Sequence, residues 1–449
     1  MPRCPAPASL AALAATLLLA LGMLTVPPAA ASDAPATRLQ PKSADYLPTG
    51  TLNFTGQDSL AGDLRLTGEG TAESPYFLVG REFSPAPGSD APLLFLGHFD
   101  AHLVVRDCRF VGAGPGEASS VSGAVVVNAS GVRFENCRFE RLGVGVTFEN
   151  FTDGLVASST FVRVGLGVAA LNGSGLVVAD NSFLEVGSAD PPAEWGSPAA
   201  LDARWVGGGV LVARNAVEGN ASRGTGLTFS WAAGAAVTGN RVDGVAVGVE
   251  CGWETRNFSV TCNVASNCSQ VGFRVYSNAA GHRLTRNVAT GNLRGLHLLG
   301  GGNLAWNNTF AGNAEAEARD DGHDNAFHVN STGNYWGDYE VRYPDQGNDG
   351  RVWDRPYDVP GTRNAADEFP LVHAVDACPA GESLPLTPLP ATGRTIGGVL
   401  PSTSVACAVA GVAWSVLHLR SALRGSRTRP GRAGGRGAAG PARAFRRVF

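Results

Sequence analysis

The segment Asp107-Cys-Arg-Phe110 indicates the type of fold, because variants of it recur along the chain. The same shape recurs as Asn136-Cys-Arg-Phe139, Ser158-Ser-Thr-Phe161 and Asp180-Asn-Ser-Phe183. An apolar residue usually stands three positions before the second residue of a copy, and another stands two positions after it. That second residue is small and polar in ten copies spaced 21 to 34 residues apart: Cys108, Cys137, Ser159, Asn181, Asn215, Asn240, Asn263, Asn287, Asn308 and Asn334.

This repeat predicts an all-β solenoid, a parallel β-helix. The spacing is too short for propeller blades of about 40 residues, and each copy supplies short β-branched strands between Gly/Asn turns. One copy cannot bury its apolar face alone, whereas stacked copies pair each strand with the same strand of the next coil. We expect the ten small polar residues to form a hydrogen-bonded ladder along the axis. Cys108 and Cys137 either stack or form a disulfide there, and poor bridging geometry between adjacent parallel strands favours stacking.

The two ends of the chain differ from this body. Residues 1–31 carry Arg3, an apolar run over 10–24 and a small-residue site before Ser32, the pattern of a secretory signal peptide. Residues 395–419 are uncharged and long enough to span a bilayer. Residues 420–449 contain nine arginines and no acid, which predicts a cytoplasmic tail after a transmembrane helix.

The linker 380–394, rich in Leu and Pro, contains Leu389, Pro390, Ala391, Thr392 and Gly393. Together with the apolar span and basic tail, this pentapeptide resembles the LPxTG sorting signal of wall-anchored bacterial proteins. The resemblance implies that a sortase cuts after Thr392 and joins the chain to the cell wall. A basic tail of 30 residues is longer than such signals carry, so retention by the membrane helix stays an equal alternative.

Charge and cysteine content describe the exterior part. When the nine tail arginines and Arg3 are set aside, the total of −4 leaves −14 on residues 32–394. This acidity argues against nucleic acid or anionic polysaccharide as a direct partner, and it is compatible with neutral sugars or cation-bridged ligands. Six cysteines outside the signal and span permit three disulfides in an oxidising compartment: Cys108, Cys137, Cys251, Cys262, Cys268 and Cys378.

We expect a monomeric exterior domain with an N-terminal cap over 32–75, coils over 76–340 and an acidic C-terminal cap over 341–379. Its longest repeat interval contains a loop with Glu194, Trp195, Asp202 and Trp205. Loops on a rigid solenoid often bind ligands, and indoles stack on sugar rings. These four residues are the candidate carbohydrate site. Alternatively, both tryptophans pack the loop onto its coil.

A second candidate site is a calcium loop in the C-terminal cap. Asp345, Asn348, Asp349 and Asp354 supply oxygen ligands around two glycines, which suits a hard cation. The spacing departs from the EF-hand loop and lacks its final glutamate. The alternative is that these residues form an acidic cap, which keeps the last coil from pairing with other chains.

The end of the repeat carries a family resemblance. It reads Gly333-Asn-Tyr-Trp-Gly-Asp-Tyr339 and continues through Asn348-Asp-Gly350, Trp353-Asp-Arg-Pro-Tyr357 and Asp367-Glu-Phe-Pro-Leu371. This resembles the NosD-like β-helix proteins, over about residues 80–371. The resemblance implies the right-handed parallel β-helix of pectate-lyase-like proteins, and it implies function much less firmly because one fold hosts many chemistries.

Three functions remain open from the sequence. The first is a surface binding or structural module, with carbohydrate as its expected ligand. The second is a polysaccharide lyase, hydrolase or epimerase, for which no catalytic residue can be assigned; the acidic cluster Asp320, Asp321, His323 and Asp324 is the nearest candidate. The third is copper handling, which the resemblance implies. Copper is disfavoured because the only methionines are Met1 and Met23, within the signal peptide.

Overall fold

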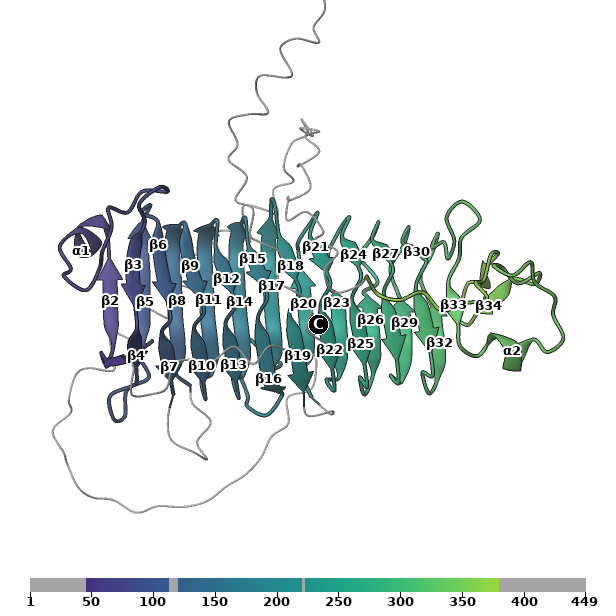
Figure 1. The fold of residues 1–449 in the computed structure, drawn as a ribbon, viewed down its shortest axis with the longest axis horizontal. Coiled ribbons are helices and arrows are strands. Elements are labelled where there is room, and N and C mark those ends of the chain that lie inside the picture. The colour runs from purple at the N-terminus through teal and green to yellow at the C-terminus, as the bar shows by residue number, and fades with distance from the viewer. Residues whose placement is uncertain (1–45, 113–119, 220–222, 379–449) are drawn as a thin grey trace, which may run out of the picture. The chain divides into compact units, whose positions relative to one another are not determined.

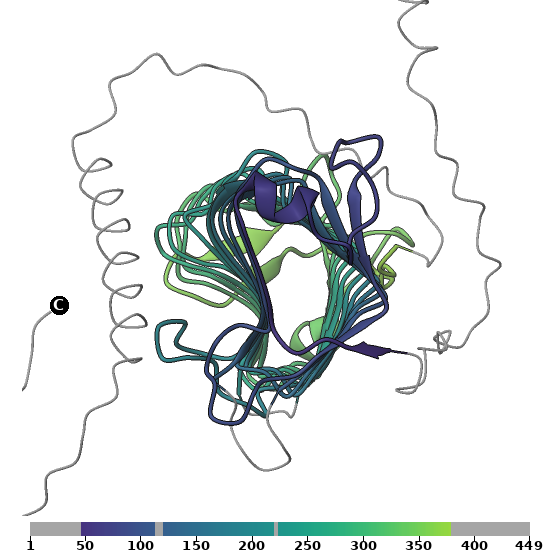
Figure 2. The same cartoon turned by 90° about the vertical axis from the view of Figure 1, so that its left-hand side faces the viewer.

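The computed structural model describes residues 46–112, 120–219 and 223–378. They form a right-handed parallel β-solenoid of about 10 turns, seen from the side in Figure 1 and along the axis in Figure 2. Within these ranges no helix is both long and apolar enough to cross a membrane. The expected signal peptide, the pentapeptide with its linker, the span over 395–419 and the basic tail lie outside the described residues.

Each coil contributes one strand to each of three parallel sheets, which we name A, B and C. Sheet A contains β1 (Leu47–Pro48), β4 (Arg81–Phe83), β7 (Arg109–Val111), β10 (Arg138–Glu140), β13 (Thr160–Val162), β16 (Ser182–Val186), β19 (Ala216–Gly219), β22 (Arg241–Asp243), β25 (Val264–Ser266), β28 (Val288–Thr290), β31 (Thr309–Ala311) and β33 (Tyr335–Trp336). Sheet B contains β2 (Leu52–Thr55), β5 (Leu94–Phe99), β8 (Ser122–Ser130), β11 (Val144–Thr152), β14 (Leu166–Ser174), β17 (Ala199–Gly207), β20 (Thr225–Ser230), β23 (Val247–Cys251), β26 (Val271–Val275), β29 (Arg294–Leu298) and β32 (Ala316–Asp320). Sheet C contains β3 (Tyr76–Val79), β6 (Leu103–Arg106), β9 (Val132–Glu135), β12 (Leu155–Ala157), β15 (Val177–Ala179), β18 (Leu211–Ala213), β21 (Ala236–Thr238), β24 (Ser259–Thr261), β27 (Arg283–Thr285) and β30 (Leu304–Trp306).

The core is the column of side chains that every coil turns inward. On sheet A, Phe83, Phe110, Phe139, Phe161 and Phe183 stack ring on ring with centroids 4.6 to 4.7 Å apart. The same register position then holds smaller residues: Val217, Val242, Ala265 and Ala289. Because parallel strands repeat one side-chain position in every coil, a single position of the repeat sets the character of the whole column.

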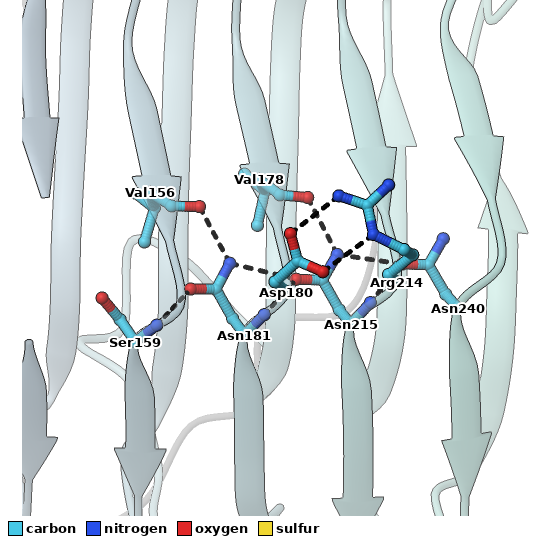
Figure 3. Close-up of polar contacts among 8 residues, drawn as sticks. All are labelled: Val156, Ser159, Val178, Asp180, Asn181, Arg214, Asn215 and Asn240. Carbon is cyan, nitrogen blue, oxygen red and sulfur yellow. Dashed lines mark hydrogen bonds and ion pairs between the residues drawn. The ribbon is translucent and has the colours of Figure 1, made fainter. Parts of the chain in front are cut away.

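The ten small polar residues lie buried in the turn that leads from sheet C to sheet A. From Ser159 onward, each backbone N–H donates to the side-chain oxygen of the next coil (Figure 3). Asn181 Nδ2 also donates to Asn215 Oδ1 at 3.0 Å and to the Val156 carbonyl at 2.9 Å, and Asn215 repeats this pattern. Cys108 and Cys137, in the first coils of the series, are free, buried thiols.

Two further ladders appear only in the later coils. One runs through Cys268, Asn292 and Asn313 after sheet A. The other runs through His282, Asn303 and Asn325 before sheet C. In both, the N–H groups of one coil donate to the acceptor of the next coil, so every ladder points its donors toward the C-terminus.

All three ladders end on a carboxylate. Asp367 Oδ2 accepts from the Asn334 amide at 2.6 Å and from Trp336 Nε1 at 2.9 Å. Glu317 accepts from Asn313 Nδ2 at 2.5 Å, and Asp320 Oδ1 accepts from Asn325 Nδ2 at 2.8 Å. A row of buried N–H donors needs a final acceptor, and a carboxylate offers several lone pairs and no donor.

The ends of the solenoid are covered. The helix α1 (Gln57–Ala61) lies at the N-terminal end, and α2 (Tyr339–Arg342) with the antiparallel pair β34 (Tyr357–Val359) and β35 (Ala365–Asp367) lies at the other end (Figure 1). A disulfide between Cys262 and Cys378 ties the chain after this cap to the coil of β24. The other four described cysteines are free and buried, so the six cysteines form one bridge rather than the three that their number permits.

Candidate functional site

The outward face of sheet B changes character at β17. In β5 to β14 its central outward column is mostly apolar, with Phe95, Val125, Thr147 and Ala169 in register. From β17 onward the same column is polar in six consecutive coils: Asp202, Thr228, Glu250, Arg274, His297 and Arg319. A polar side chain at one register position in every coil forms a track parallel to the solenoid axis.

Each charged side chain of this track forms an ion pair, either with another track residue or with a residue beside the track. Arg204 Nε donates to Asp202 Oδ1 at 3.0 Å, beside the track on the same strand. Arg274 Nε donates to Glu250 Oε2 at 2.7 Å. Burial raises the pKa of Asp202, although its hydrogen bonds with Arg204 act in the opposite direction.

At the C-terminal end of the track, Asp321 joins two side chains. Its Oδ2 accepts from Arg319 Nε at 2.6 Å and lies 3.0 Å from His297 Nε2. The hydrogen bonds from Arg319 lower the pKa of the Asp321 carboxyl. Burial lowers the pKa of His297, which leaves that imidazole neutral at pH 7.

Beside the track stands a row of exposed indoles from three successive coils. Trp205, Trp231 and Trp253 are 45%, 42% and 51% exposed. The rings of Trp205 and Trp231 stack with centroids 4.4 Å apart and planes 5° from parallel. The backbone N–H of Trp231 donates to the Trp253 carbonyl, and the Trp253 ring lies 6.1 Å from that of Tyr276.

Two of these tryptophans occupy a backbone conformation that bulky residues avoid. Trp205 has φ 53° and Trp231 has φ 51°, in the left-handed region. The pairing of Leu171 with Arg204 places Trp205 in register with Asn172. Asn172 itself continues the column of Asn128 and Asn150, which also have positive φ. Asparagine adopts this conformation at little cost, whereas an indole gains nothing from it locally.

A groove of about 440 Å³ lies between the track and Trp231 of the indole row; Trp205 and Trp253 are not in its lining. Its walls combine aromatic side chains with hydroxyls and paired charges, a mixture typical of ligand sites. The lining includes Trp195, Asp202, Arg204, Thr228, Ser230, Trp231, Glu250, Arg274 and Tyr276.

Three of the four predicted sugar-site residues lie in or beside this groove. Asp202 and Trp195 line it, and the Trp195 ring lies 5.0 Å from the Arg204 guanidinium carbon. Trp205 stands in the indole row. Glu194 is exposed in the loop and does not line the groove. The Trp195 ring also packs against the apolar cluster around Leu166, so the loop-packing alternative describes part of its role.

Sequence reasoning missed Trp231, Trp253, Glu250 and Arg274. A signal for Trp231 is present, because it stands 26 residues after Trp205, within the range of the repeat. The ion pair between Glu250 and Arg274 could not be predicted from the repeat in the same way. The two residues stand on neighbouring coils, and only the strand register shows that they lie side by side.

The proposed calcium residues lie in the C-terminal cap. Asn348 Oδ1 accepts from the Gly350 amide, and Asp349 Oδ1 accepts from the amides of Arg351 and Val352, so these oxygens close a turn. In the described part of the chain no three His, Cys, Asp or Glu side chains gather in a way that could hold a metal ion. The calcium site stays a prediction.

The acidic cluster Asp320, Asp321, His323 and Asp324 divides among three environments. Asp320 ends a ladder inside the coil. Asp321 joins the paired track on the outward face. His323 Nδ1 and Asp324 Oδ2 form an exposed contact at 3.2 Å. The four residues therefore do not form one acidic site.

Copper does not fit the donor set of the described residues. Cys108, Cys137, Cys251 and Cys268 are buried, and Cys262 is in the disulfide. Burial lowers the pKa of His282 to about 4, and the ring accepts the Phe258 amide within the core. Without a gathered set of three His, Cys, Asp or Glu side chains in these ranges, no soft-metal centre is assembled here.

Several solved structures are similar to this chain at low sequence identity. Similar solved structures include the periplasmic alginate epimerase AlgG (12% identity, 63% of this chain and 85% of that chain, TM-score 0.36) and the A-module of the Azotobacter vinelandii mannuronan C-5 epimerase AlgE6 (14%, 64% and 87%, TM-score 0.43). A third is PfbA, a surface adhesin of Streptococcus pneumoniae (9%, 56% and 79%, TM-score 0.30). None of these likenesses supports a statement about what this chain binds. No curated protein matches the sequence. Residues 205–341 match the family model described as periplasmic copper-binding protein (NosD).

Proposed function

We propose that this protein is an exported, surface-retained β-helix that binds carbohydrate in the groove between the indole row and the polar track. The groove offers stacking surfaces beside hydroxyl and carboxylate groups, which is the combination a sugar requires. Sugar rings present an apolar face and a hydroxyl edge, and aromatic side chains accept the former while polar groups accept the latter.

The observation that carries this proposal is the placement of Trp205 and Trp231. A left-handed backbone costs a side chain other than glycine or asparagine about 1–2 kcal/mol. The same column holds His98 and then three asparagines in the earlier coils, so the fold does not require an indole at this position. Backbone strain clusters at functional sites, although turns of this coil also place other bulky residues, such as Arg163 and Arg214, at positive φ. Both rings are large, exposed and clustered, as a ligand platform would need.

A glycan array probed with the secreted protein tests the proposal. We expect binding to at least one polysaccharide, and we expect Trp231→Ala to reduce it at least tenfold. Trp306→Ala is the matched control, because Trp306 lies outward on β30 of sheet C. Equal binding by wild type and Trp231→Ala, or no binding to any glycan by folded wild type, would contradict the proposal.

A second candidate function, glycoside hydrolysis, has one observation in its favour. Asp202 and Glu250 both line the groove, and each pairs in register with Thr228 between them. Strands about 4.8 Å apart place their Cα atoms roughly 9 to 10 Å apart, near the range of about 6.5–9.5 Å for the carboxyl groups of inverting enzymes. Release of reducing ends that Asp202→Asn and Glu250→Gln abolish would establish hydrolysis. Binding without product would leave the module function.

Surface retention rests on the terminal segments. The signal peptide before Ser32 and the disulfide of Cys262 with Cys378 both suit an oxidising exterior. Mass spectrometry of the mature chain distinguishes the two anchoring routes. A product ending at Thr392 indicates sortase cleavage, whereas an intact tail indicates a retained membrane helix.

A further inference from the structure

The groove and the track beyond it carry three ion pairs along sheet B; the first two pairs line the groove, and the third lies farther along the track. Asp202 pairs with Arg204, Glu250 with Arg274, and Asp321 with Arg319. His297 adds no charge at pH 7, because burial lowers its pKa. The track is therefore neutral, although the exterior part of the chain is strongly acidic.

These pairs are difficult to open. The arginine side chains keep 21% to 37% of their exposure and the carboxylates 8% to 17%, so solvent screens them incompletely. An anionic sugar at Arg274 would either displace Glu250 or place its own negative charge beside that carboxylate, which already balances the charge of Arg274. Separating a partly buried pair in this way is strongly unfavourable.

An uncharged ligand can use the pairs as they stand. Each carboxylate has lone pairs beyond those that its arginine occupies, and each guanidinium has five N–H donors. Thr228 and Ser230 add hydroxyls between the charged coils. Sugar hydroxyls can donate to these carboxylates and accept from these guanidinium groups without breaking an ion pair.

The groove is elongated along the solenoid axis. Its lining runs from Asp202 of β17 and Trp195 in the loop before it, through β20 and β23, to Arg274 of β26 and Tyr276 directly after it. Four neighbouring strands at about 4.8 Å spacing extend roughly 14 Å along the axis, longer than one sugar ring. A ligand in the groove therefore crosses the strands and follows the solenoid axis.

We infer that the groove takes an uncharged, hydroxyl-rich segment of a polysaccharide, lying along the solenoid axis, and rejects the uronate form of the same sugar. This inference rests on the proposed carbohydrate-binding function and names its ligand class. In the intact groove the cation of Arg274 is not available to a sugar carboxylate, because Glu250 occupies it.

The test uses matched oligosaccharide pairs that differ only at C6: gluco-, galacto- and manno-oligosaccharides and their uronate counterparts. Calorimetry on the secreted protein is expected to give at least tenfold tighter binding for the neutral member of the bound pair. Its Kd should change less than twofold between 50 and 500 mM NaCl, because no ion pair forms with the ligand.

Glu250→Gln supplies the decisive variant, since it frees Arg274 within the groove. It should improve the uronate Kd at least tenfold. Glu135→Gln, which frees Arg106 on sheet C, is the matched control and should change nothing. Circular dichroism and thermal unfolding confirm that both variants fold.

Each outcome bears on one of the two proposals. Tighter binding of the uronate by wild type, or no gain of uronate binding in folded Glu250→Gln, would overturn the inference and leave the carbohydrate function in place. Binding of neither form of any pair, with no glycan bound on the array, would defeat the carbohydrate function itself.

Discussion

In the coils from β4 to β16 the inward position of sheet A holds a stack of phenylalanine rings, whereas in the coils from β19 to β28 it holds valine and alanine. The space that the rings vacate is not empty. The Phe183 ring lies 2.5 Å from where a Cβ of Gly167 would stand, and in a later coil the Asn292 amide lies 3.0 Å from the same point of Gly272. At this place in the cross-section of the coil, a side-chain amide of a hydrogen-bonded ladder takes the space that a phenylalanine ring fills in the earlier coil.

This difference shows that one repeat geometry accepts two kinds of core. The N-terminal coils gain stability from burial of large apolar area. At this register position the later coils bury the smaller side chains of valine and alanine, and their ladders satisfy rows of amides that would otherwise be expensive to bury. The outward face of sheet B changes at the same boundary, where β17 begins the polar track and the indole row. The groove thus begins where the ring stack ends, and the two further ladders begin a few coils later.

The largest effect is expected from the disulfide, which belongs only to the polar half. Cys262 and Cys378 are separated by 116 residues, and removal of a closed loop of that length is expected to cost about 4–5 kcal/mol of unfolding free energy. Urea unfolding of the Cys262→Ser, Cys378→Ser double variant measures this loss. Hydrogen exchange should show lost protection in β25 to β31 and retained protection in β7 to β13.

The reduced wild-type protein provides the control for that variant. Reductant should lower the stability of wild type to the level of the double variant and leave the double variant unchanged. Equal loss of protection in both halves would mean that the solenoid unfolds as one unit, and the division into two regions would then have no energetic counterpart.

A matched pair of core variants compares the two halves directly. Phe161→Ala removes a ring from the centre of the stack and should cost about 3–5 kcal/mol. Asn263→Ala leaves the backbone and side-chain amides of Asn240 without their acceptor, which should cost about 2–6 kcal/mol at about 1–3 kcal/mol for each of the two stranded buried groups. Denaturation curves with local hydrogen exchange should assign each loss to its own half.

Volume-preserving substitutions separate the two mechanisms. Asn263→Asp keeps the acceptor and the size but removes the donor to Val237, and it should still destabilise the protein. Phe161→Leu keeps apolar volume and should recover much of the loss. If Asn263→Ala proved neutral, hydrogen bonding would not explain why these coils tolerate small core residues.

The ladder and the coil architecture were predictable from sequence because a solenoid repeats one position many times. Ten small polar residues, most of them with apolar neighbours at fixed offsets, suffice to align the coils. Asp367 was not predictable as the final acceptor. It lies 33 residues after Asn334, outside the repeat, and only the hairpin of β34 and β35 brings it to the ladder.

The groove was half predictable for a related reason. The long loop drew attention to Trp195, Trp205 and Asp202, which belong to one coil. Its other residues come from later coils with no insertion to mark them. Their significance depends on lateral register, which sequence reading at the level of single coils does not supply. Ion pairs between coils, such as Arg274 with Glu250, depend on the same register.

Titration of Asp367 offers a further test of the polar half. Burial raises its pKa in the folded protein to about 6, against hydrogen bonds that act in the opposite direction, from a usual value of 3.8. The folded state thus favours the protonated acid. This contribution is fully present below pH 4 and is lost as the pH rises through 6, a change of about 3 kcal/mol at 1.36 kcal/mol per pKa unit.

Urea unfolding between pH 4 and pH 7 measures the slope, and Asp367→Asn removes this carboxyl from it. The difference in unfolding free energy between wild type and Asp367→Asn should shrink by up to about 3 kcal/mol as the pH rises across that window. A difference that instead grows with pH would show that the N–H donors of Asn334 and Trp336 hold Asp367 as a carboxylate, and that the ladder ends on a fixed negative charge.

The smallest effect concerns the strained indole row, where stability and binding should separate. Trp231→Asn and Trp231→Ala both remove the stack on Trp205 and should both lose glycan binding. Asparagine suits φ 51° better than alanine does, so Trp231→Asn should be the more stable of the two by about 1 kcal/mol. Differential scanning calorimetry of the pair isolates the backbone preference, because each variant has lost the same ring. An asparagine variant no more stable than the alanine variant would mean that the left-handed turn is imposed by the coil at no local cost. The indoles would then need no functional reason to occupy it, and the case for a ligand platform would rest on their exposure alone.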